Sequence, residues 1–525
     1  MNSMVVKQTC FVAVLVITLF SCKKTEVVQV PVEQGTKNDT TAPVITGFTP
    51  GVSWYGNIVT INGTGFSKLA SKVWIGTTPA EILTATETSI KIKIAPATQG
   101  GYIHVKVNGR EGISSKELII DQLAWTKEIG GSDGEIAICI IPIPGGYMVT
   151  GYTNSKDGDI KPGHGGLDMW VAQLDSNRNI KWQQSIGGSG NDLAGYIVPS
   201  SDGGYVLTGY STSKDGDLAG GPGGTADIWA IKLSIDGAIV WKKPLGGTGD
   251  DEATAIANTA DGGYLITGYT ASNDKDVTGL HGGEDMWVVK LNGNGQIVWQ
   301  KTLGGSKQDG GSAIKPTADG GCIVAGYTSS TDGDVQGKHG GEDLWVVRLN
   351  ANGGIVWQKP LGGASYEYAL SLAITADGGC VVAGSTGSSD GDVTGLKGAS
   401  DIWIIKLTSA GGISWQQTLG GSGNEDPIAI IPTTDGGYMI AANTDSNDGD
   451  IGNNHGSSDI WIAKLNANRT ITGKRTLGGS GGEIAFSMAT TPDNGYVVAG
   501  YSNSTNGDLH DSHGYYDMWL FKIWQ

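Results

Sequence analysis

The sequence predicts an all-β protein in which a small N-terminal domain precedes a ring of seven repeated units. Three observations carry this prediction. Two tryptophan ladders share one period, strand-like segments alternate with glycine-rich turns, and the last repeat lacks a strand that occurs before the first. Each repeated unit must bury its apolar faces against its neighbours, so self-similarity at a fixed period indicates the architecture before any local motif does.

The repeats begin at Trp125 and follow a period of 57 to 59 residues. One position is tryptophan in six copies and Gly473 in the seventh; the six are Trp125, Trp182, Trp241, Trp299, Trp357 and Trp415. A second ladder, Asp-x-Trp, is unbroken and contains Trp170, Trp229, Trp287, Trp345, Trp403, Trp461 and Trp519. We expect a tryptophan repeated seven times to be buried between units, and we expect functional residues where the copies differ.

The copy from Asp251 to Gly305 shows the elements of one unit. The expected strands are Ala253–Thr259, Tyr264–Tyr269, Asp285–Leu291 and Gln296–Leu303. Asp-Gly-Gly and Asn-Gly-Asn-Gly turns separate them, and no helical period is present. Such spacing indicates an all-β fold. The uninterrupted apolar run at 286–289 indicates that both faces of the sheet are covered, as they are when sheets pack around an axis.

The seventh copy ends with a strand at 517–525 and lacks the strand that should follow. The missing strand occurs instead at 124–131, before the first full copy. These features predict a seven-bladed β-propeller of four-stranded blades, closed by the N-terminal strand. The Asp-Gly-Gly-Tyr, Ala/Thr-Gly-Tyr and late Trp motifs resemble kelch-like propeller repeats of the bacterial delta-sixty kind. This resemblance concerns the fold and implies no particular activity.

Composition sets further limits. The chain has 525 residues, which suits two or three domains, and a formal net charge of −17. A strongly acidic chain with a pI near 4.8 is a poor partner for phosphate backbones, so we expect no nucleic acid to bind. Glycine accounts for 86 residues but recurs at fixed positions of the repeat, which indicates turns rather than disorder.

The N-terminus predicts export and lipid anchoring. Lys7 precedes an apolar run, Phe11–Phe20, that is too short to span a membrane and is typical of a signal peptide. The following Ser21-Cys22 completes a motif that resembles a bacterial lipobox, which implies cleavage after residues 1–21 and a lipid on Cys22. An ordinary secretory signal is the alternative. We expect an outer-membrane location, on either the periplasmic or the surface face.

Residues 22–41 are a polar tether, and the character of the sequence changes at residue 42. Short alternating segments between residues 42 and 120 predict a β-sandwich. Its motifs, above all Ile61-Asn-Gly-Thr-Gly-Phe66, resemble those of an IPT/TIG immunoglobulin-like domain. Such a resemblance implies a spacer or a partner-binding module. The predicted propeller then occupies residues 122–525.

An acidic residue follows each Gly-Gly pair after four positions. The set is Glu135, Asp192, Asp251, Asp309, Glu367, Glu425 and Glu483. In a propeller this loop leads into the innermost strand, so seven carboxylates can ring one mouth of the channel, repel one another and recruit cations. In the alternative interpretation, each carboxylate accepts backbone N–H groups of its own turn.

Aspartates recur in the long loop of each copy, and a histidine slot follows them. The candidate calcium ligands are Asp157, Asp159, Asp332 and Asp334. Alternating oxygen ligands suit Ca²⁺, the only cofactor that the sequence suggests. Asx turns explain the same aspartates without an ion, and the histidine slot becomes Gly223 and Lys397 in two copies, which weakens any metal role.

Departures from the repeat are the candidate ligand-binding residues. Tyr366 and Tyr368 replace small or polar residues in one loop, and Tyr515 and Tyr516 do so in another. Exposed tyrosine offers flat, amphipathic surface to sugars or peptides. No nucleophile elbow, zinc signature, P-loop or dinucleotide fingerprint is present. Cys139, Cys322 and Cys380 are expected to be buried apolar residues.

Together these observations predict a lipid-anchored envelope protein that binds a glycan or a partner protein through propeller loops. A propeller lyase or glycosidase that uses the channel-mouth carboxylates is the enzymatic alternative. A structural or adhesive protein is the third interpretation.

Overall fold

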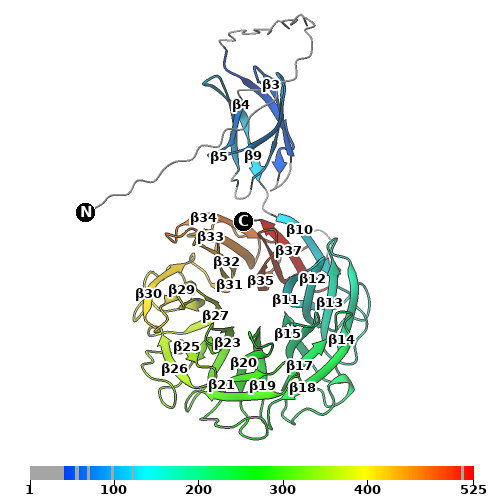
Figure 1. The fold of residues 1–525 in the computed structure, drawn as a ribbon, viewed down its shortest axis with the longest axis vertical. Coiled ribbons are helices and arrows are strands. Elements are labelled where there is room, and N and C mark those ends of the chain that lie inside the picture. The colour runs from blue at the N-terminus through cyan, green and yellow to red at the C-terminus, as the bar shows by residue number, and fades with distance from the viewer. Residues whose placement is uncertain are drawn as a thin grey trace, which may run out of the picture.

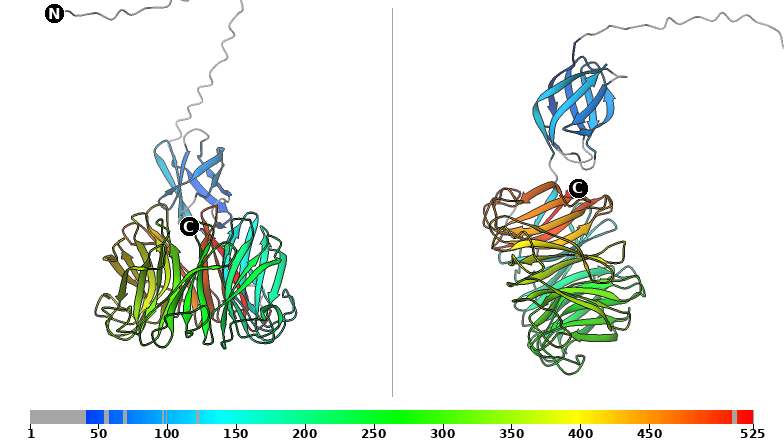
Figure 2. Two further views of the ribbon diagram at one scale, coloured as in Figure 1. Left: turned by 60° about the horizontal axis from the view of Figure 1, so that its bottom comes forward. Right: turned by 90° about the vertical axis from the view of Figure 1, so that its left-hand side faces the viewer.

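The computed structural model describes residues 41–53, 58–67, 71–95, 98, 100–120, 123–509 and 513–524, and the prediction of an all-β protein is confirmed. Figure 1 shows a small sandwich beside a ring of sheets, and Figure 2 shows both parts from two further directions. Within the described ranges the helical content is one short 3-10 turn, Gly216–Leu218, and no helix is long and apolar enough to cross a membrane. The signal peptide and Cys22 lie outside the described residues.

The N-terminal part is a β-sandwich of two sheets. One sheet has the order β1-β3-β7-β6, with β1 Val44–Thr49, β3 Ile58–Thr64, β7 Ser89–Lys93 and β6 Glu81–Ala85. The other has the order β2-β9-β8-β4-β5, with β2 Val52–Ser53, β9 Arg110–Ile120, β8 Gly101–Val107, β4 Ser71–Ile75 and β5 Thr78–Pro79. Alternating residues such as Ile61, Ile90 and Ile103 point between the sheets and are fully buried, because successive side chains of a strand face opposite sides.

The repeated part forms seven four-stranded antiparallel sheets among the described residues. Innermost are β11 Glu135–Ile143, β15 Asp192–Pro199, β19 Asp251–Asn258, β23 Asp309–Pro316, β27 Glu367–Ile374, β31 Glu425–Pro432 and β35 Glu483–Thr490 (Figure 1). The second strands are β12 Gly146–Thr153, β16 Tyr205–Ser211, β20 Tyr264–Thr270, β24 Cys322–Thr328, β28 Cys380–Thr386, β32 Tyr438–Thr444 and β36 Gly495–Ser502.

The third strands carry the Asp-x-Trp ladder and are β13 Asp168–Asp175, β17 Asp227–Leu233, β21 Asp285–Leu291, β25 Asp343–Leu349, β29 Asp401–Leu407, β33 Asp459–Leu465 and β37 Asp517–Trp524. The outermost strands are β14 Ile180–Ile186, β18 Ile239–Leu245, β22 Ile297–Leu303, β26 Ile355–Leu361, β30 Ile413–Leu419 and β34 Ile471–Leu477. In the seventh sheet the outermost position belongs to β10, Leu123–Ile129, which pairs antiparallel with β37.

The first and seventh sheets are in direct contact. The backbone N–H of Ile140, on β11, donates a hydrogen bond to Ser487 Oγ, on β35, over 3.1 Å. A short parallel bridge also joins Gly134 to Tyr516. The two ends of the repeated region are therefore held together both by strand pairing and by contacts between sheets.

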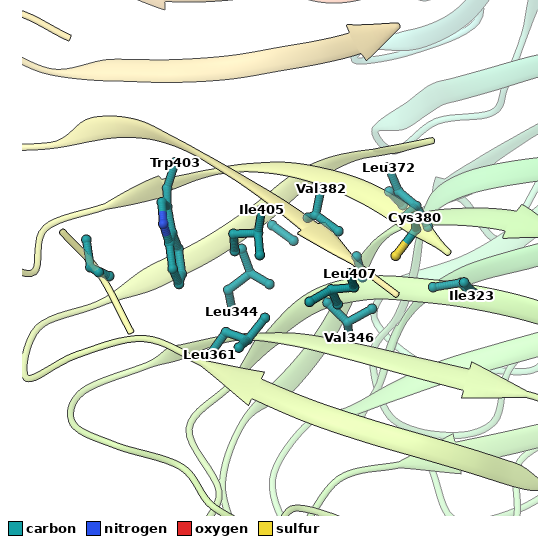
Figure 3. Close-up of a cluster of buried hydrophobic side chains, with 14 residues drawn as sticks. Ile323, Leu344, Val346, Leu361, Leu372, Cys380, Val382, Trp403, Ile405 and Leu407 are labelled. Atoms are coloured by element: carbon teal, nitrogen blue, oxygen red, sulfur yellow. The ribbon is translucent and has the colours of Figure 1, made fainter. Parts of the chain in front are cut away.

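The Asp-x-Trp tryptophans fill the spaces between neighbouring sheets. All seven are at most 2% exposed. Figure 3 shows Trp403, on the fifth sheet, beside Leu344 and Leu361 of the fourth. Its indole Nε1 donates to Gln416 Oε1 at 2.9 Å, so the polar end of the ring is also satisfied. The interpretation of this ladder as buried packing between units is confirmed.

The other tryptophan ladder covers hairpin turns on the outside. The Trp299 ring packs against Gly353 in the hairpin of the next sheet, and its Nε1 donates to Ala351 O at 3.0 Å. Gly353 has a φ of +79°, a conformation that glycine adopts without strain. Where arginine takes this hairpin position, as at Arg469, its guanidinium lies over the ring of the covering tryptophan, Trp415, 5.1 Å from the centroid.

The same contact explains the exception at Gly473. This residue pairs with Lys464, as Trp415 pairs with Lys406, so it occupies the tryptophan position of the sixth sheet. The next sheet has β10 at its edge, far from β37 in sequence, so no hairpin turn joins the two strands there. A tryptophan at position 473 would have no turn to cover.

The three cysteines of the described region are free and buried, as expected. Burial raises the pKa of the Cys139 thiol to about 11, which keeps it protonated and unreactive.

Candidate functional site at one mouth of the ring

The seven acids after the Gly-Gly pairs begin the innermost strands, but their side chains do not face the channel. All seven are 0% exposed: Glu135, Asp192, Asp251, Asp309, Glu367, Glu425 and Glu483. Glu425 is representative, since its Oε2 accepts the N–H of Gly421 at 2.8 Å and its Oε1 accepts the Thr444 hydroxyl at 2.8 Å. The burial of these acids does not support the channel-facing interpretation, whereas the alternative fits, because each carboxylate accepts the N–H of the glycine four residues before it.

Burial, rather than repulsion around a ring, sets the charge state of these acids. Desolvation raises the pKa of Glu135, Asp251 and Glu425, and hydrogen bonds to each carboxylate partly offset this rise. The carboxylate that adds to the rise belongs to the Asp-x-Trp motif of the preceding copy, as Asp401 does for Glu425. These acids therefore belong to the seam between sheets.

The candidate calcium ligands are also engaged locally. Asp157 Oδ1 accepts the N–H of Ser132 at 2.8 Å, and Asp332 Oδ1 accepts that of Ser306 at 2.7 Å. The backbone N–H of Ser306 lowers the pKa of Asp332. Asp159 Oδ2 lies 4.0 Å from Lys127 Nζ. These contacts engage the aspartates without an ion, but the N–H donors belong to the loops that lead into the innermost strands and not to the aspartates' own loops.

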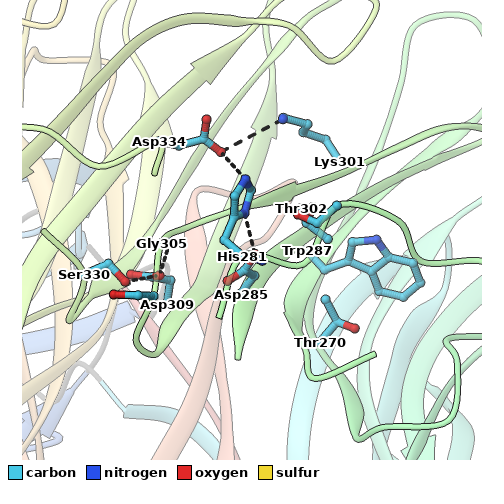
Figure 4. Close-up of polar contacts among 12 residues, drawn as sticks. Thr270, His281, Asp285, Trp287, Lys301, Thr302, Gly305, Asp309, Ser330 and Asp334 are labelled. Atoms are coloured by element: carbon cyan, nitrogen blue, oxygen red, sulfur yellow. Dashed lines mark hydrogen bonds and ion pairs between the residues drawn. The ribbon is translucent and has the colours of Figure 1, made fainter. Parts of the chain in front are cut away.

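The histidine slot joins neighbouring sheets. Figure 4 shows His281 between Asp285 of its own sheet and Asp334 of the next, with Nδ1 2.7 Å and Nε2 3.9 Å from their carboxylate oxygens. Asp334 also lies 4.0 Å from Lys301 Nζ. Across the part of the chain that the structure describes, no three His, Cys, Asp or Glu side chains are close enough to hold one metal ion. Calcium binding therefore stays a prediction without a ligand cluster to support it.

A tyrosine ring, which the sequence reasoning missed, lies at the end of the channel where the innermost strands begin. Its members follow a glycine of the second strand and pair with the second residue of the innermost strand, as Tyr327 follows Gly326 and pairs with Gly310. They are Tyr152, Tyr210, Tyr269, Tyr327 and Tyr501, all half-buried. Burial is the main cause that raises the pKa of Tyr210 to about 12, and the nearby Glu252 and Tyr152 add to the rise. Its hydroxyl therefore stays protonated.

The tyrosine ring is interrupted in two adjacent sheets, where Ser385 and Asn443 take the tyrosine position. Ser385 Oγ donates to Asp426 Oδ1 at 2.7 Å. Asn443 is fixed by the backbone of Ala485, whose N–H donates to Asn443 Oδ1 at 2.8 Å. The Gly-Tyr pairs of the repeat, broken at these two places, are the sequence signal that could have revealed this gap.

The four tyrosines singled out from the sequence flank the gap. On one side, Tyr368 packs edge-on against Tyr327, with ring centroids 5.6 Å apart, and Tyr366 lies 6.0 Å from Tyr368. Tyr368 also hydrogen-bonds Glu342, and burial together with this carboxylate raises its pKa. Tyr366 remains 51% exposed.

On the other side of the gap, Tyr516 packs against Tyr501 at 5.0 Å, and Tyr515 packs against Tyr516 at 4.8 Å. Tyr515 is 74% exposed. Phe486 lies 6.1 Å from Tyr501 and continues the aromatic surface toward the gap. The structure therefore places the two predicted tyrosine pairs on opposite flanks of one interruption.

A cavity of about 360 Å³ occupies the gap. Its lining includes Tyr196, Tyr368, Ser385, Asp426, Asn443 and Phe486. Asp426 is exposed, and its neighbours offer aromatic faces, a hydroxyl and an amide. This combination of flat apolar surface with a few polar groups is typical of a small-molecule or sugar site.

Comparison with known proteins identifies the N-terminal β-sandwich. Residues 43–118 match the family model of the IPT/TIG domain. No curated protein matches the chain. Similar solved structures include the Pan2 WD40 domain of Neurospora crassa, at 10% identity, TM-score 0.42, and coverage of 74% of this chain and 89% of that one.

An auxiliary nutrient binding protein of Bacteroides thetaiotaomicron is also similar, at 11% identity, TM-score 0.30, and coverage of 76% and 95% respectively. Sqt1 from Chaetomium thermophilum is 11% identical with TM-score 0.39, and 76% of this chain and 100% of that one are covered. With its ring of four-stranded sheets and its IPT/TIG domain, the chain has a propeller-type fold that suggests a binding or scaffold protein.

Proposed function

We propose that the seven sheets are the blades of one closed β-propeller, in which β10 completes the seventh blade. The pairing of β10 with β37 and the hydrogen bond from Ile140 to Ser487 support this proposal. A closed ring leaves no terminal blade with an unpaired face, and the strand from the N-terminal side fastens the last blade to the rest.

The proposed function of this propeller is to bind a glycan in the gap of the tyrosine ring. The observation that carries the proposal is the coincidence of the cavity with the two positions, Ser385 and Asn443, where the repeat loses its tyrosine. Aromatic rings on both flanks can stack on sugar faces, while Asp426 can accept hydrogen bonds from sugar hydroxyls. A site built from residues that depart from the repeat occurs once, whereas a site built from repeated residues would occur seven times.

Binding is better supported than glycoside cleavage. A glycosidase needs two carboxylates on opposite sides of the bond that it cuts. Among the described residues that line the gap cavity, Asp426 is the one carboxylate, and it already accepts the Ser385 hydroxyl. The seven buried acids cannot supply the second group, because none of them is exposed.

The proposed setting is the bacterial envelope. A lipid on Cys22 would anchor the mature chain to the outer membrane, and residues 22–41 would tether it. The IPT/TIG domain would then hold the propeller away from the membrane as a spacer. Mass spectrometry of the protein from membranes tests this anchor, since a diacylated Cys22 at the mature N-terminus is expected and an unmodified N-terminus would contradict it.

A glycan array probed with the full chain and three variants tests the binding site. Combined Tyr366→Ala and Tyr368→Ala should weaken capture by roughly tenfold or more, because one or two stacking contacts are lost. Asp426→Asn should weaken it through the lost carboxylate. Asn443→Tyr, which restores the residue of the repeat, should block the cavity.

Tyr152→Ala provides the matched control, since it removes a tyrosine of the same ring away from the gap. Capture should then stay at the unmodified level. If Asn443→Tyr and Asp426→Asn bind as the unmodified chain does, the site lies elsewhere. A chain that captures no glycan on the array but retains a protein from the envelope would favour the partner-protein interpretation.

A further inference from the structure

A second cavity, of about 440 Å³, lies in the channel beneath the mouth. The innermost strands of all seven sheets contribute to its wall, which is mainly isoleucine, leucine, valine and alanine. Four residues line both this cavity and the gap cavity, namely Tyr196, Leu370, Ile428 and Phe486. The two cavities therefore adjoin.

One residue breaks the apolar character of the channel. Lys315, on β23, pairs with Ile323 of the second strand. The residues with the same register in the other six sheets are Ile141, Val198, Ala257, Ala373, Ile431 and Ala489. At this register the other six sheets have an apolar residue, and the fourth sheet has Lys315. The lysine is therefore a charged residue that departs from the repeat inside the channel.

The lysine has no counterion. Among the described residues, no carboxylate lies within ion-pairing distance of Lys315, whereas Lys232, Lys290, Lys406 and Lys464 each pair with an aspartate. The titratable side chains in the channel wall are Cys139, Tyr196 and Lys315 itself. Cys139, on the first sheet, is the group that interacts electrostatically with Lys315, on the fourth. Lys315 is exposed to solvent within the channel, and partial desolvation by the groups around it lowers its pKa.

Because Lys315 is exposed, water can solvate its ammonium when no ligand is bound, and an anion can displace that water. An apolar residue at this position is structurally sufficient, as the other six sheets show. A lysine that lines a cavity and departs from the repeat is a candidate functional residue for this reason. The site combines a cation that has no counterion among the described residues with a wall that is mainly aliphatic.

We propose that Lys315 is the anchor of a second ligand site, in which its ammonium binds the carboxylate of a small amphipathic acid whose apolar tail fills the channel. A single cation matches the single charge of a carboxylate, whereas a phosphate usually requires several donors. The aliphatic wall matches a hydrocarbon tail, whose burial supplies most of the affinity. This site is separate from the glycan site at the gap, although the two cavities share wall residues.

Calorimetric titration of the full chain with octanoate, and with octanol as the uncharged analogue, tests this proposal. Octanoate should bind to the unmodified chain more tightly than octanol. Lys315→Met should weaken octanoate binding by roughly tenfold or more, because a charge-assisted contact is lost, and should leave octanol binding unchanged. Lys315→Arg should retain octanoate binding.

Thermal melting separates binding from folding. Lys315→Met should melt close to the temperature of the unmodified chain, because Lys315 is exposed and makes no ion pair with the described residues. Absence of octanoate binding to the unmodified chain, or equal octanoate binding by Lys315→Met, would overturn the proposal. The glycan array is read independently with the same Lys315→Met protein, which should capture glycans normally, so the two proposals fail separately.

Discussion

The seam between sheets and the gap in the tyrosine ring lie one residue apart yet follow opposite rules. On β28, Gly384 pairs with Trp403 of the unbroken tryptophan ladder, while the next residue, Ser385, departs from the repeat and lines the gap cavity. Residues at the seam must fit a neighbouring sheet and so repeat in every copy. Residues at the mouth face solvent and are free to differ, which is why a single asymmetric site can form on a repeated scaffold.

The largest expected effect is a loss of stability when a residue of the seam is replaced. Trp403→Ala removes a fully buried indole and should lower the free energy of unfolding by about 3–5 kcal/mol. Tyr366→Ala, at the exposed mouth, should change it by no more than about 0.5 kcal/mol. Chemical denaturation of both variants measures the difference, and equal losses would show that the mouth also serves stability.

A second, smaller effect concerns the protonation of Glu425, a buried carboxyl group at the seam. Burial raises the pKa of Glu425 above its ordinary value of 4.5, so the folded state binds the proton more tightly than the unfolded state. The contribution of Glu425 to stability is therefore full below that ordinary value, and it is lost as the pH rises through the raised, folded-state pKa.

Melting curves of the unmodified chain and of Glu425→Gln between about pH 4 and about pH 8 measure this dependence. The melting temperature of the unmodified chain should fall relative to that of Glu425→Gln as the pH rises. Trp403→Ala changes no titratable group, so its melting difference should not follow the same trend. A Glu425→Gln difference that is constant with pH would mean that this carboxylate is not destabilised by burial.

The smallest expected effect is that of metal removal. Asp157 and Asp332 already accept backbone N–H groups, so a chelator should leave the melting temperature unchanged. A drop in melting temperature that added Ca²⁺ reverses would restore the calcium interpretation. It would also show that the long loops contribute more than turn capping to the scaffold.

Much of the scaffold could be predicted from the sequence. The period of the Asp-x-Trp ladder, the turn glycines and the alternating segments before residue 120 indicated the all-β fold and the sandwich. Tyr366, Tyr368, Tyr515 and Tyr516 were identified because they break the repeat. For the acids the sequence left two interpretations open, because spacing places Glu425 at the start of an innermost strand but does not tell whether its side chain turns toward the channel or toward Gly421.

The sequence by itself determined the repeated unit, because the pairing of strands and the burial of tryptophan depend on local pattern and recur with it. Only the tertiary structure decided which departures belong together. Tyr196 and Phe486 are far apart in the chain, and they line one cavity with Ser385 and Asn443 only because the fold brings strands of different sheets together. Lys315 likewise becomes unusual only when the sheets are compared, because the residues with its register in the other six sheets are all apolar.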